Sequence, residues 1–275
     1  MQTKPDEQLK ARVRSHWTEE PCGTRGVDGS DRRAFFAAME AERDQLEPFI
    51  AGFARFAEGK GKKVLEVGVG PGNDFIRWVR AGAVATGVDL TAAGIALTKE
   101  RVALEGLQAE LLQADAEQLP FADNTFDIVY SYGVLHHTPD TNKSVAEVFR
   151  VLKPGGIARL MLYQNPSITG VLLWAVHGLG KGKPWMTPRE AVYEHLESPG
   201  TKSYSFAELD VLLAAFEKRT YQAELLGGDL LSFRPSKKYP SAWHKAAFRL
   251  YPTQLVRKFG RRFGHAILIE ARKPA

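Results

Sequence analysis

The sequence predicts an α/β fold in which helices cover both faces of a mainly parallel sheet. Short apolar, β-prone runs alternate with segments of helical spacing between about residues 63 and 163, which is typical of right-handed strand-helix-strand units. A run of glycines follows the first apolar segment. With 44% hydrophobic residues among 275, the chain has enough apolar surface for a core of this kind.

The first unit of this alternation predicts a strand, a glycine loop, a helix and a second strand. The strand covers Val64–Val67, Gly68 and Gly70 lie in the loop, and the helix starts near Asn73. Glycines allow a tight turn and a close ligand, while the free amides of the helix start favour a polar or anionic group. The second strand ends in Asp89, whose oxygens can accept hydrogen bonds from a ribose diol. The first hypothesis is therefore a nucleoside-containing cofactor.

The alternation continues to residue 163. The expected elements are a helix at 91–105 capped by Thr91, strands at 109–114 and 124–131, a loop at 132–140, a helix at 141–152, a turn at 153–156 and a strand at 157–163. Asp115 and Ala116 stand at the third strand tip, where a side chain and an amide can read an adenine edge. The alternative is that Asp115 only caps the segment after it.

The glycine loop narrows the choice of cofactor. A dinucleotide fingerprint has a third glycine, and Asn73 stands in its place. Glu66 would repel a pyrophosphate but attract an ammonium or sulfonium group. These two observations favour S-adenosylmethionine over NAD.

Four motifs in order, VLEVGVGPGND, GVDLT, ADAEQLPFADNTFDIVYSYGVLHHTPD and VLKPGG, resemble those of class I S-adenosylmethionine-dependent methyltransferases. Within that class they resemble the broad group similar to the ubiquinone and menaquinone methyltransferases (methyltransferase type 11). The resemblance covers about residues 60–163 and implies a three-layer, Rossmann-like fold. Its sheet has seven strands, mainly parallel, with the last one antiparallel.

The resemblance also implies which residues hold the cofactor. The methionine part would meet Glu66 and the glycines, the ribose Asp89, the adenine face Leu90, and the amino acid end the backbone near Ser131. The complete expected set is Glu66, Gly68, Val69, Gly70, Asn73, Asp89, Leu90, Asp115, Ala116, Glu117, Ser131 and Tyr132.

The loop after the fourth strand holds the candidate catalytic residues, His136 and His137. A neutral imidazole can remove a proton from an acceptor near pH 7. The alternative is that the pair belongs to the loop motif and only packs or bonds backbone. No metal site is expected, because adjacent loop residues rarely aim both rings at one ion and no third ligand is evident.

The core is expected to divide the chain into four parts: a helical flap or cap at 1–58, the cofactor core at 59–163, an insertion forming a substrate cap at 164–204, and the end of the sheet at 205–275. The N-terminal helix could be a lid or could only stabilise the fold. The helical segment at 33–56, divided by Pro48, is expected to pack without a chemical role. Candidate acceptor-site residues are aromatic, with core packing as the alternative for each: Trp17, Tyr163, Trp185, Tyr193 and Tyr204.

Positive charge is concentrated in residues 234–262, which hold nine Lys and Arg and no Asp or Glu. Removing these nine charges from the net +5 leaves −4 for the rest of the chain. The segment could contact an anionic membrane surface, an acidic or phosphorylated acceptor, or RNA, or it could be a solvated helix. Nucleic acid ranks last, because no RNA-binding motif accompanies the segment.

The expected function is methylation of a small, hydrophobic or anionic metabolite by an S-adenosylmethionine-dependent enzyme. Open alternatives are cyclisation or aminocarboxypropyl transfer with the same cofactor, a nicotinamide oxidoreductase and a non-enzymatic S-adenosylmethionine-binding protein. A single cysteine and no signal peptide or spanning segment favour a cytoplasmic setting. The sequence does not predict the oligomeric state.

Overall fold

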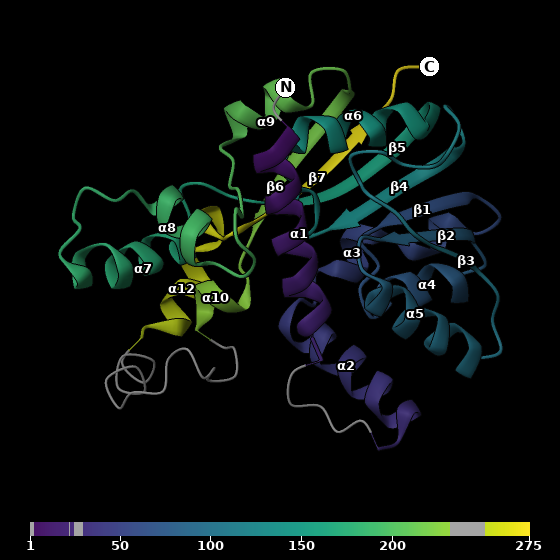
Figure 1. The fold of residues 1–275 in the computed structure, drawn as a ribbon, viewed down its shortest axis with the longest axis horizontal. Coiled ribbons are helices and arrows are strands. Elements are labelled where there is room, and N and C mark those ends of the chain that lie inside the picture. The colour runs from purple at the N-terminus through teal and green to yellow at the C-terminus, as the bar shows by residue number, and fades with distance from the viewer. Residues whose placement is uncertain (1–2, 22, 25–29, 232–250) are drawn as a thin grey trace.

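A computed structural model describes residues 3–21, 23–24, 30–231 and 251–275, which form one seven-stranded sheet between helices (Figure 1). The strand order is β3-β2-β1-β4-β5-β7-β6. The strands are β1 (Lys63–Val67), β2 (Val84–Asp89), β3 (Glu110–Gln113), β4 (Phe126–Tyr132), β5 (Leu152–Tyr163), β6 (Glu217–Glu224) and β7 (Ala266–Arg272).

Helices precede, connect and follow these strands. The α-helices are α1 (Thr3–Glu19), α2 (Arg32–Leu46), α3 (Ile50–Ala54), α4 (Phe75–Arg80), α5 (Ala92–Leu104), α6 (Thr141–Val151), α7 (Ile168–His177), α8 (Pro188–His195), α9 (Phe206–Leu212), α10 (Gly227–Leu230) and α12 (Thr253–Phe259). The 3₁₀ turns are η1 (Phe56–Gly59), η2 (Leu135–His137), η3 (Leu179–Lys181) and η4 (Arg261–Phe263).

The predicted sheet is confirmed. Strands β1 to β5 pair in parallel, and β7 is antiparallel to both of its neighbours. One boundary was wrong, because the expected turn at 153–156 lies inside β5, which begins at Leu152. The β4–β5 register shifts between Phe126 and Ile128, so the strand absorbs this turn as an irregularity.

Alternating side chains of the central strands feed two core layers. Val64 of β1 belongs to the cluster under α4 and α5, which contains Trp78, whereas Leu65 belongs to the cluster that holds Val148 of α6. Both faces of the sheet are therefore covered, and the carboxyl ends of the parallel strands remain as the edge where a ligand can bind.

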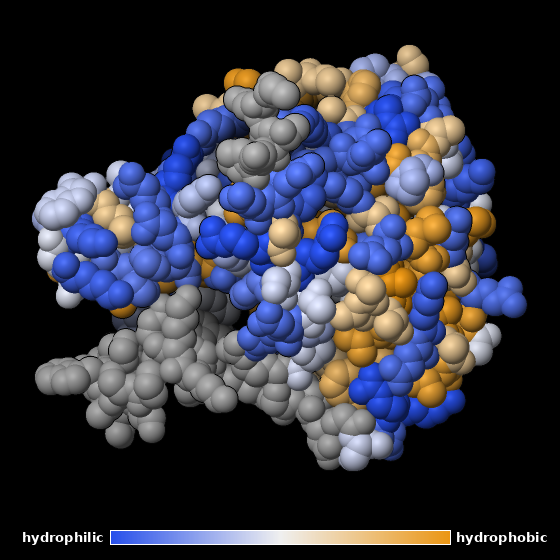
Figure 2. All heavy atoms as spheres, viewed as in Figure 1, coloured by the Kyte–Doolittle hydropathy of each residue, from blue (hydrophilic) through white to orange (hydrophobic). Residues whose placement is uncertain are grey.

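The N-terminal helices lie across the sheet at this edge (Figure 1). Helix α1 is 17 residues long, and its outer surface is hydrophilic (Figure 2). The predicted division at Pro48 is confirmed, since α2 ends at Leu46 and α3 starts at Ile50. No helix in the described ranges is both long and apolar enough to cross a membrane.

Helices α7, α8, α10 and α12, with η3 and η4, form what we call the lobe, which stands at the opposite end of the molecule from β3 (Figure 1). Its central anchor is Asp229, which is fully buried. The Asp229 carboxylate accepts hydrogen bonds from the backbone amides of Thr169, Leu226 and His265, at 2.7 to 2.9 Å. One side chain thus ties α7 and α10 to the start of β7.

Candidate active site

The glycine loop leaves the tip of β1 beside the tip of β4. The Ser131 hydroxyl donates to the Val67 carbonyl at 2.9 Å, so its side chain is used inside the protein. Gly68 has φ +83°, and a Cβ there would lie 2.2 Å from a Val134 methyl carbon. Gly70 has φ +50° and would meet nothing within 4 Å. A side chain at Gly68 would therefore clash with Val134, whereas Gly70 borders open space that a ligand can use.

Asp89, at the tip of β2, clamps the glycine loop. Its carboxylate accepts from the Gly70 amide at 2.8 Å and from the amide and hydroxyl of Thr91 at 2.8 and 2.7 Å. A carboxylate has about four lone-pair sites, so at least one remains for a ribose hydroxyl. Of its neighbours in the expected set, Val69 is buried in the core, whereas Leu90 is half-buried beside the strand tip.

Buried carboxylates gather beneath the glycine loop. Glu66 is 4% exposed, and its Oε2 has no hydrogen-bond partner among the described residues. Burial raises the pKa of Glu66 well above its usual value, and the nearby Asp74 carboxylate raises it further. Asp74 accepts from the Tyr130 hydroxyl at 2.8 Å and from Arg43 at 3.0 Å. An unpartnered buried acid of this kind fits a cationic group, such as the ammonium of S-adenosylmethionine.

Most of the segment at 33–56 packs as expected, with Phe35, Phe36 and Met39 of α2 buried, but Arg43 of the same helix also reaches the site. Arg43 bonds Glu47 at 2.5 Å and lies 4.6 Å from the centre of the Tyr132 ring. The Tyr132 hydroxyl donates to Glu47 at 3.2 Å. The sequence contained a signal for this contribution. Arg43 and Glu47 are four residues apart just before Pro48, a spacing that lets them pair on a helix whose other contacts are expected to be apolar.

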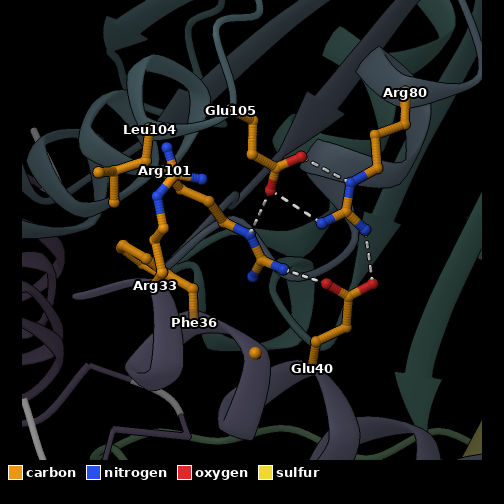
Figure 3. Close-up of a pocket in the computed structure, with 8 residues that line it drawn as sticks. Arg33, Phe36, Glu40, Arg80, Arg101, Leu104 and Glu105 are labelled. Atoms are coloured by element: carbon orange, nitrogen blue, oxygen red, sulfur yellow. Dashed lines mark hydrogen bonds and ion pairs between the residues drawn. The ribbon is translucent and has the colours of Figure 1, made fainter. Parts of the chain in front are cut away.

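Asn73 connects the glycine loop to a ring of ion pairs formed by Glu40, Arg80, Arg101 and Glu105, and Figure 3 shows these four residues. The Asn73 Oδ1 accepts from Arg101 at 2.6 Å, while Glu40 and Glu105 each bridge Arg101 and Arg80. The ring borders a hollow of about 230 Å³ lined by Arg33, Phe36, Ala37, Glu40, Arg80, Arg101, Leu104 and Glu105. The acids and most of the bases of this ring are already paired with one another. Its role is therefore structural, because it joins α2 to α4 and α5.

The residues that are expected to bind the adenine of the cofactor are joined to helix α1. Asp115 and Glu117 both bond Lys10, at 2.5 and 2.7 Å. Asp115 also accepts from the Glu117 amide at 2.9 Å, which closes a turn; no described helix starts there, so Asp115 is not the helix cap that the alternative expected. The second Glu117 oxygen accepts from the Asp140 amide at 2.7 Å, and Ala116 is buried. Sequence reasoning missed Lys10, because no motif links residues about a hundred positions apart.

His136 is fully buried in η2. Its ring centre lies 3.9 Å from that of Tyr163 and 4.3 Å from that of His137, and neither of its nitrogens has a hydrogen-bond partner in the described ranges. Burial holds its pKa well below the usual value, and the neighbouring His137 adds to this. The imidazole is therefore neutral. Its ring packs against Tyr163 at the root of the lobe, which is the place where β5 leads into α7 and η4 leads into β7.

His137 has a more polar environment. Its Nδ1 lies 2.9 Å from the Ser198 hydroxyl and 3.1 Å from that of Thr201. Its Nε2 lies 3.5 Å from the Glu197 carboxylate, which is too long for a good hydrogen bond. Trp17 of α1 packs edge-on at 5.4 Å between ring centres. The hydroxyls can hold Nδ1 while Nε2 stays available beside a carboxylate.

Glu197 was not predicted from the sequence. Its backbone is left-handed, with φ +47°, and Tyr163 donates to it at 2.8 Å. Partial desolvation acts to raise the pKa of Glu197, but the nearby imidazole of His137 and the hydrogen bond from Tyr163 outweigh it, so the pKa falls below its usual value. The side chain remains 38% exposed, so a small molecule can reach the carboxylate.

The aromatic residues that are expected to line the acceptor site fall into two groups. Tyr163 lies at the site, and the Tyr204 amide donates to its carbonyl at 2.8 Å. Trp185 and Tyr193, by contrast, are 76% and 47% exposed. The expectation that these two rings enclose an acceptor is corrected, because both lie on the surface of the lobe.

Comparison with known proteins agrees with this arrangement. Residues 65–160 match the family model described as a methyltransferase domain. Residues 65–160 therefore form a methyltransferase domain. The domain has the class I S-adenosylmethionine-dependent fold, as its motifs predicted, although nothing singles out the ubiquinone and menaquinone group.

A phthiotriol/phenolphthiotriol dimycocerosates methyltransferase of Mycobacterium ulcerans is 36% identical over 162 residues, which are 53% of this chain and 58% of that protein. The aligned part of the chain thus spans little more than half of this relative. A putative methyltransferase of Bacillus halodurans is 24% identical, with a TM-score of 0.55, over 82% of this chain and 99% of that one.

A phosphoethanolamine N-methyltransferase of Haemonchus contortus, solved with S-adenosylhomocysteine, has a TM-score of 0.60 and 15% identity, over 96% of this chain and 60% of that one. Its likeness shows the fold. The unpartnered Glu66 and the open space at Gly70, within a methyltransferase domain, support S-adenosylmethionine as the cofactor of that domain.

Most of the predicted basic segment, residues 234–250, lies outside the described residues. The described remainder includes α12 and η4, in which Arg261 pairs with Glu224. Among the residues described, no three His, Cys, Asp or Glu side chains are grouped as metal ligands.

Proposed function

We propose that the chain is a methyltransferase that transfers a methyl group from S-adenosylmethionine to a hydroxyl group of a small, lipophilic molecule. The observation that carries the proposal is the position of His137 on the turn directly after β4, with Nε2 unpartnered among the described residues and 3.5 Å from Glu197. A hydroxyl must lose its proton as it attacks, and this nitrogen can accept it. The lipophilic acceptor is supported by the Mycobacterium ulcerans relative, whose name specifies dimycocerosates.

The cofactor supplies a methyl group on a sulfonium, and the protein's main task is to align the nucleophile with it. Glu66 and Asp74 would attract the ammonium, and Asp89 would accept from the ribose. Ser198 and Thr201 would hold the proton of His137 on Nδ1, so that Nε2 takes the acceptor proton. Glu197 would then stabilise the imidazolium, because a carboxylate close to it favours the charged form.

We also propose a division of labour along the chain. Residues 59–163 would hold the cofactor, residues 1–58 would cover it, residues 164–204 would cap the acceptor, and residues 205–275 would complete the sheet. Support comes from Lys10, which crosses to Asp115, and from Glu197, which reaches back to Tyr163.

Two measurements test this function. Calorimetry should detect binding of S-adenosylmethionine and S-adenosylhomocysteine but not of NADH; binding of NADH alone would favour an oxidoreductase. Label from tritiated S-adenosylmethionine should then pass to 4-octylphenol or 1,2-hexadecanediol. Transfer to dodecylamine alone would show a different nucleophile, and bound cofactor without transfer to any probe would favour cyclisation or aminocarboxypropyl transfer.

A further inference from the structure

Exposed apolar side chains are concentrated in the lobe. The described part of the chain exposes eleven large hydrophobic side chains, and seven of them fall within residues 171–185 and 255–263. They are Val171, Val176, Leu179, Trp185, Leu255, Phe259 and Phe263. Such side chains usually occur singly on a surface, so this concentration indicates an interaction site.

These side chains occupy helix faces that no described element covers. On α12, Leu255 and Phe259 are four residues apart and thus lie on one face, 58% and 66% exposed. On α7, Val171 and Ala175 have the same spacing, and both are exposed. Trp185 follows η3 and is the most exposed aromatic residue in the described ranges, at 76%.

Positive charge is concentrated in the same two segments, whereas α8 of the lobe exposes Glu190 and Glu194. Residues 168–187 and 251–263 contain six Lys and Arg and no Asp or Glu. Apart from Arg261, none of the six makes an ion pair with a residue that the structure describes; these five are Lys181, Lys183, Arg257, Lys258 and Arg262. The surface therefore combines apolar side chains with unneutralised cations.

The two segments form one continuous structure. A Cβ added at Gly260 would lie 3.0 Å from Ile168 Cδ1, so the end of α12 abuts the first turn of α7. Gln164 donates to the Arg262 carbonyl at 2.9 Å, and the Tyr251 hydroxyl donates to the Asp229 carbonyl at 2.7 Å. The lobe projects from the body of the molecule in Figure 2.

The composition distinguishes among possible partners. Binding to nucleic acid depends on Lys and Arg contacts to phosphate and does not explain exposed Val, Leu and Phe. A protein partner would not require the absence of acidic residues from both segments. Exposed apolar and aromatic side chains in two segments whose only charged residues are cations match an anionic bilayer, where the former enter the interface and the latter attract headgroups.

We propose that the lobe docks on the surface of an anionic lipid bilayer, with Trp185, Leu255 and Phe259 entering the interface and the surrounding Lys and Arg held by headgroup phosphates. This inference is independent of the reaction assigned above. It is consistent with that reaction, however, because the Tyr163–Glu197 bond joins the root of the lobe to the site. A docked lobe would place the acceptor site close to lipophilic molecules.

Vesicle co-sedimentation tests the proposal. The 275-residue chain should bind vesicles of phosphatidylcholine and phosphatidylglycerol (7:3) and should not bind phosphatidylcholine alone. A Trp185→Ser/Phe259→Ser variant and a Lys181→Gln/Lys183→Gln/Arg257→Gln/Lys258→Gln variant should each lose at least tenfold in partition, the charge variant because each cation near the surface contributes about 1 kcal/mol. High salt should reverse binding of the parent protein.

Matched controls are available on other elements. Val211→Ser on α9 removes an apolar side chain that is 78% exposed, and Lys143→Gln on α6 removes a cation that is 64% exposed. Both controls should bind as the parent does, and equal thermal midpoints should show that all variants fold. Absence of binding, equal binding to neutral vesicles, or full binding by the lobe variants would overturn the proposal.

Discussion

The donor end of the molecule, where the methyl donor is expected to bind, and the lobe differ in which side chains they bury and which they expose. At the donor end, Asp89 and Asp74 accept hydrogen bonds from within the protein, while one oxygen of Glu66 and one of Asp74 are buried without a partner among the described residues. The lobe instead exposes apolar side chains and cations with few partners. One region is built to fix a single small molecule, and the other has the composition of an adaptable contact surface.

The largest effect is expected where the two regions meet. His137→Asn should lower kcat by about 10² to 10⁴, the usual contribution of a general base, while the affinity for S-adenosylhomocysteine stays within about twofold. His195→Asn, in the lobe, is the matched control and should leave kcat unchanged. Single-turnover methyl transfer measures both, and an unchanged rate in His137→Asn would remove the base from the mechanism.

Asp89→Ala should affect the donor end almost as strongly. It removes the clamp on Gly70 together with the expected ribose contact, so the Kd for S-adenosylhomocysteine should rise about 100-fold, the worth of two charge-assisted hydrogen bonds. Asp127→Ala removes a carboxylate at the opposite end of the sheet, where it accepts from the Lys63 amide, and should leave Kd unchanged. Calorimetry that finds equal Kd values in both variants would refute the assignment.

His265 should make the root of the lobe sensitive to acid. Burial lowers its pKa to about 4, against 6.5 when unfolded. As the pH falls from 6.5 to 4, the unfolded chain binds a proton that the folded chain does not, so folding should lose up to about 3 kcal/mol. Urea unfolding across this range should show a shallower decline for His265→Gln. The raised pKa of Glu66 acts in the opposite direction, but it is common to both proteins and cancels in their difference.

Lys10→Met should have the smallest effect. It keeps the aliphatic stem and removes the bonds to Asp115 and Glu117, so α1 should lose roughly 1 kcal/mol of local stability, as expected for a pair that is 22% exposed at the lysine. Hydrogen exchange of the α1 amides measures this loss. Lys143→Met is the control, and identical α1 protection in both variants would show that Lys10 does not hold the helix.

The sequence was most informative where local chemistry determines position. Gly68, Asp89 and the Thr91 cap could be located because a turn, a strand tip and a helix start each have their own residue requirements. The fold followed from the same alternation, because βαβ units pair in only a few ways.

Residues that reach the site through tertiary packing could not be located. Arg43, Lys10 and Glu197 lie on elements whose local pattern indicates only a helix or a turn. Trp185 shows the converse, since an aromatic residue in an insertion can face either a site or solvent, and the packing of α7 against α8 decides which.

The position of β7 has a consequence for synthesis of the chain. In the described sheet, β6 is bonded to β7 alone, and β7 fills the place between β5 and β6. Residues 217–224 therefore have no strand to join until residues 266–272 have left the ribosome. Until then β5 presents an open apolar edge, so the nascent protein depends on β7, which is made after both β5 and β6, to close a surface that could otherwise aggregate.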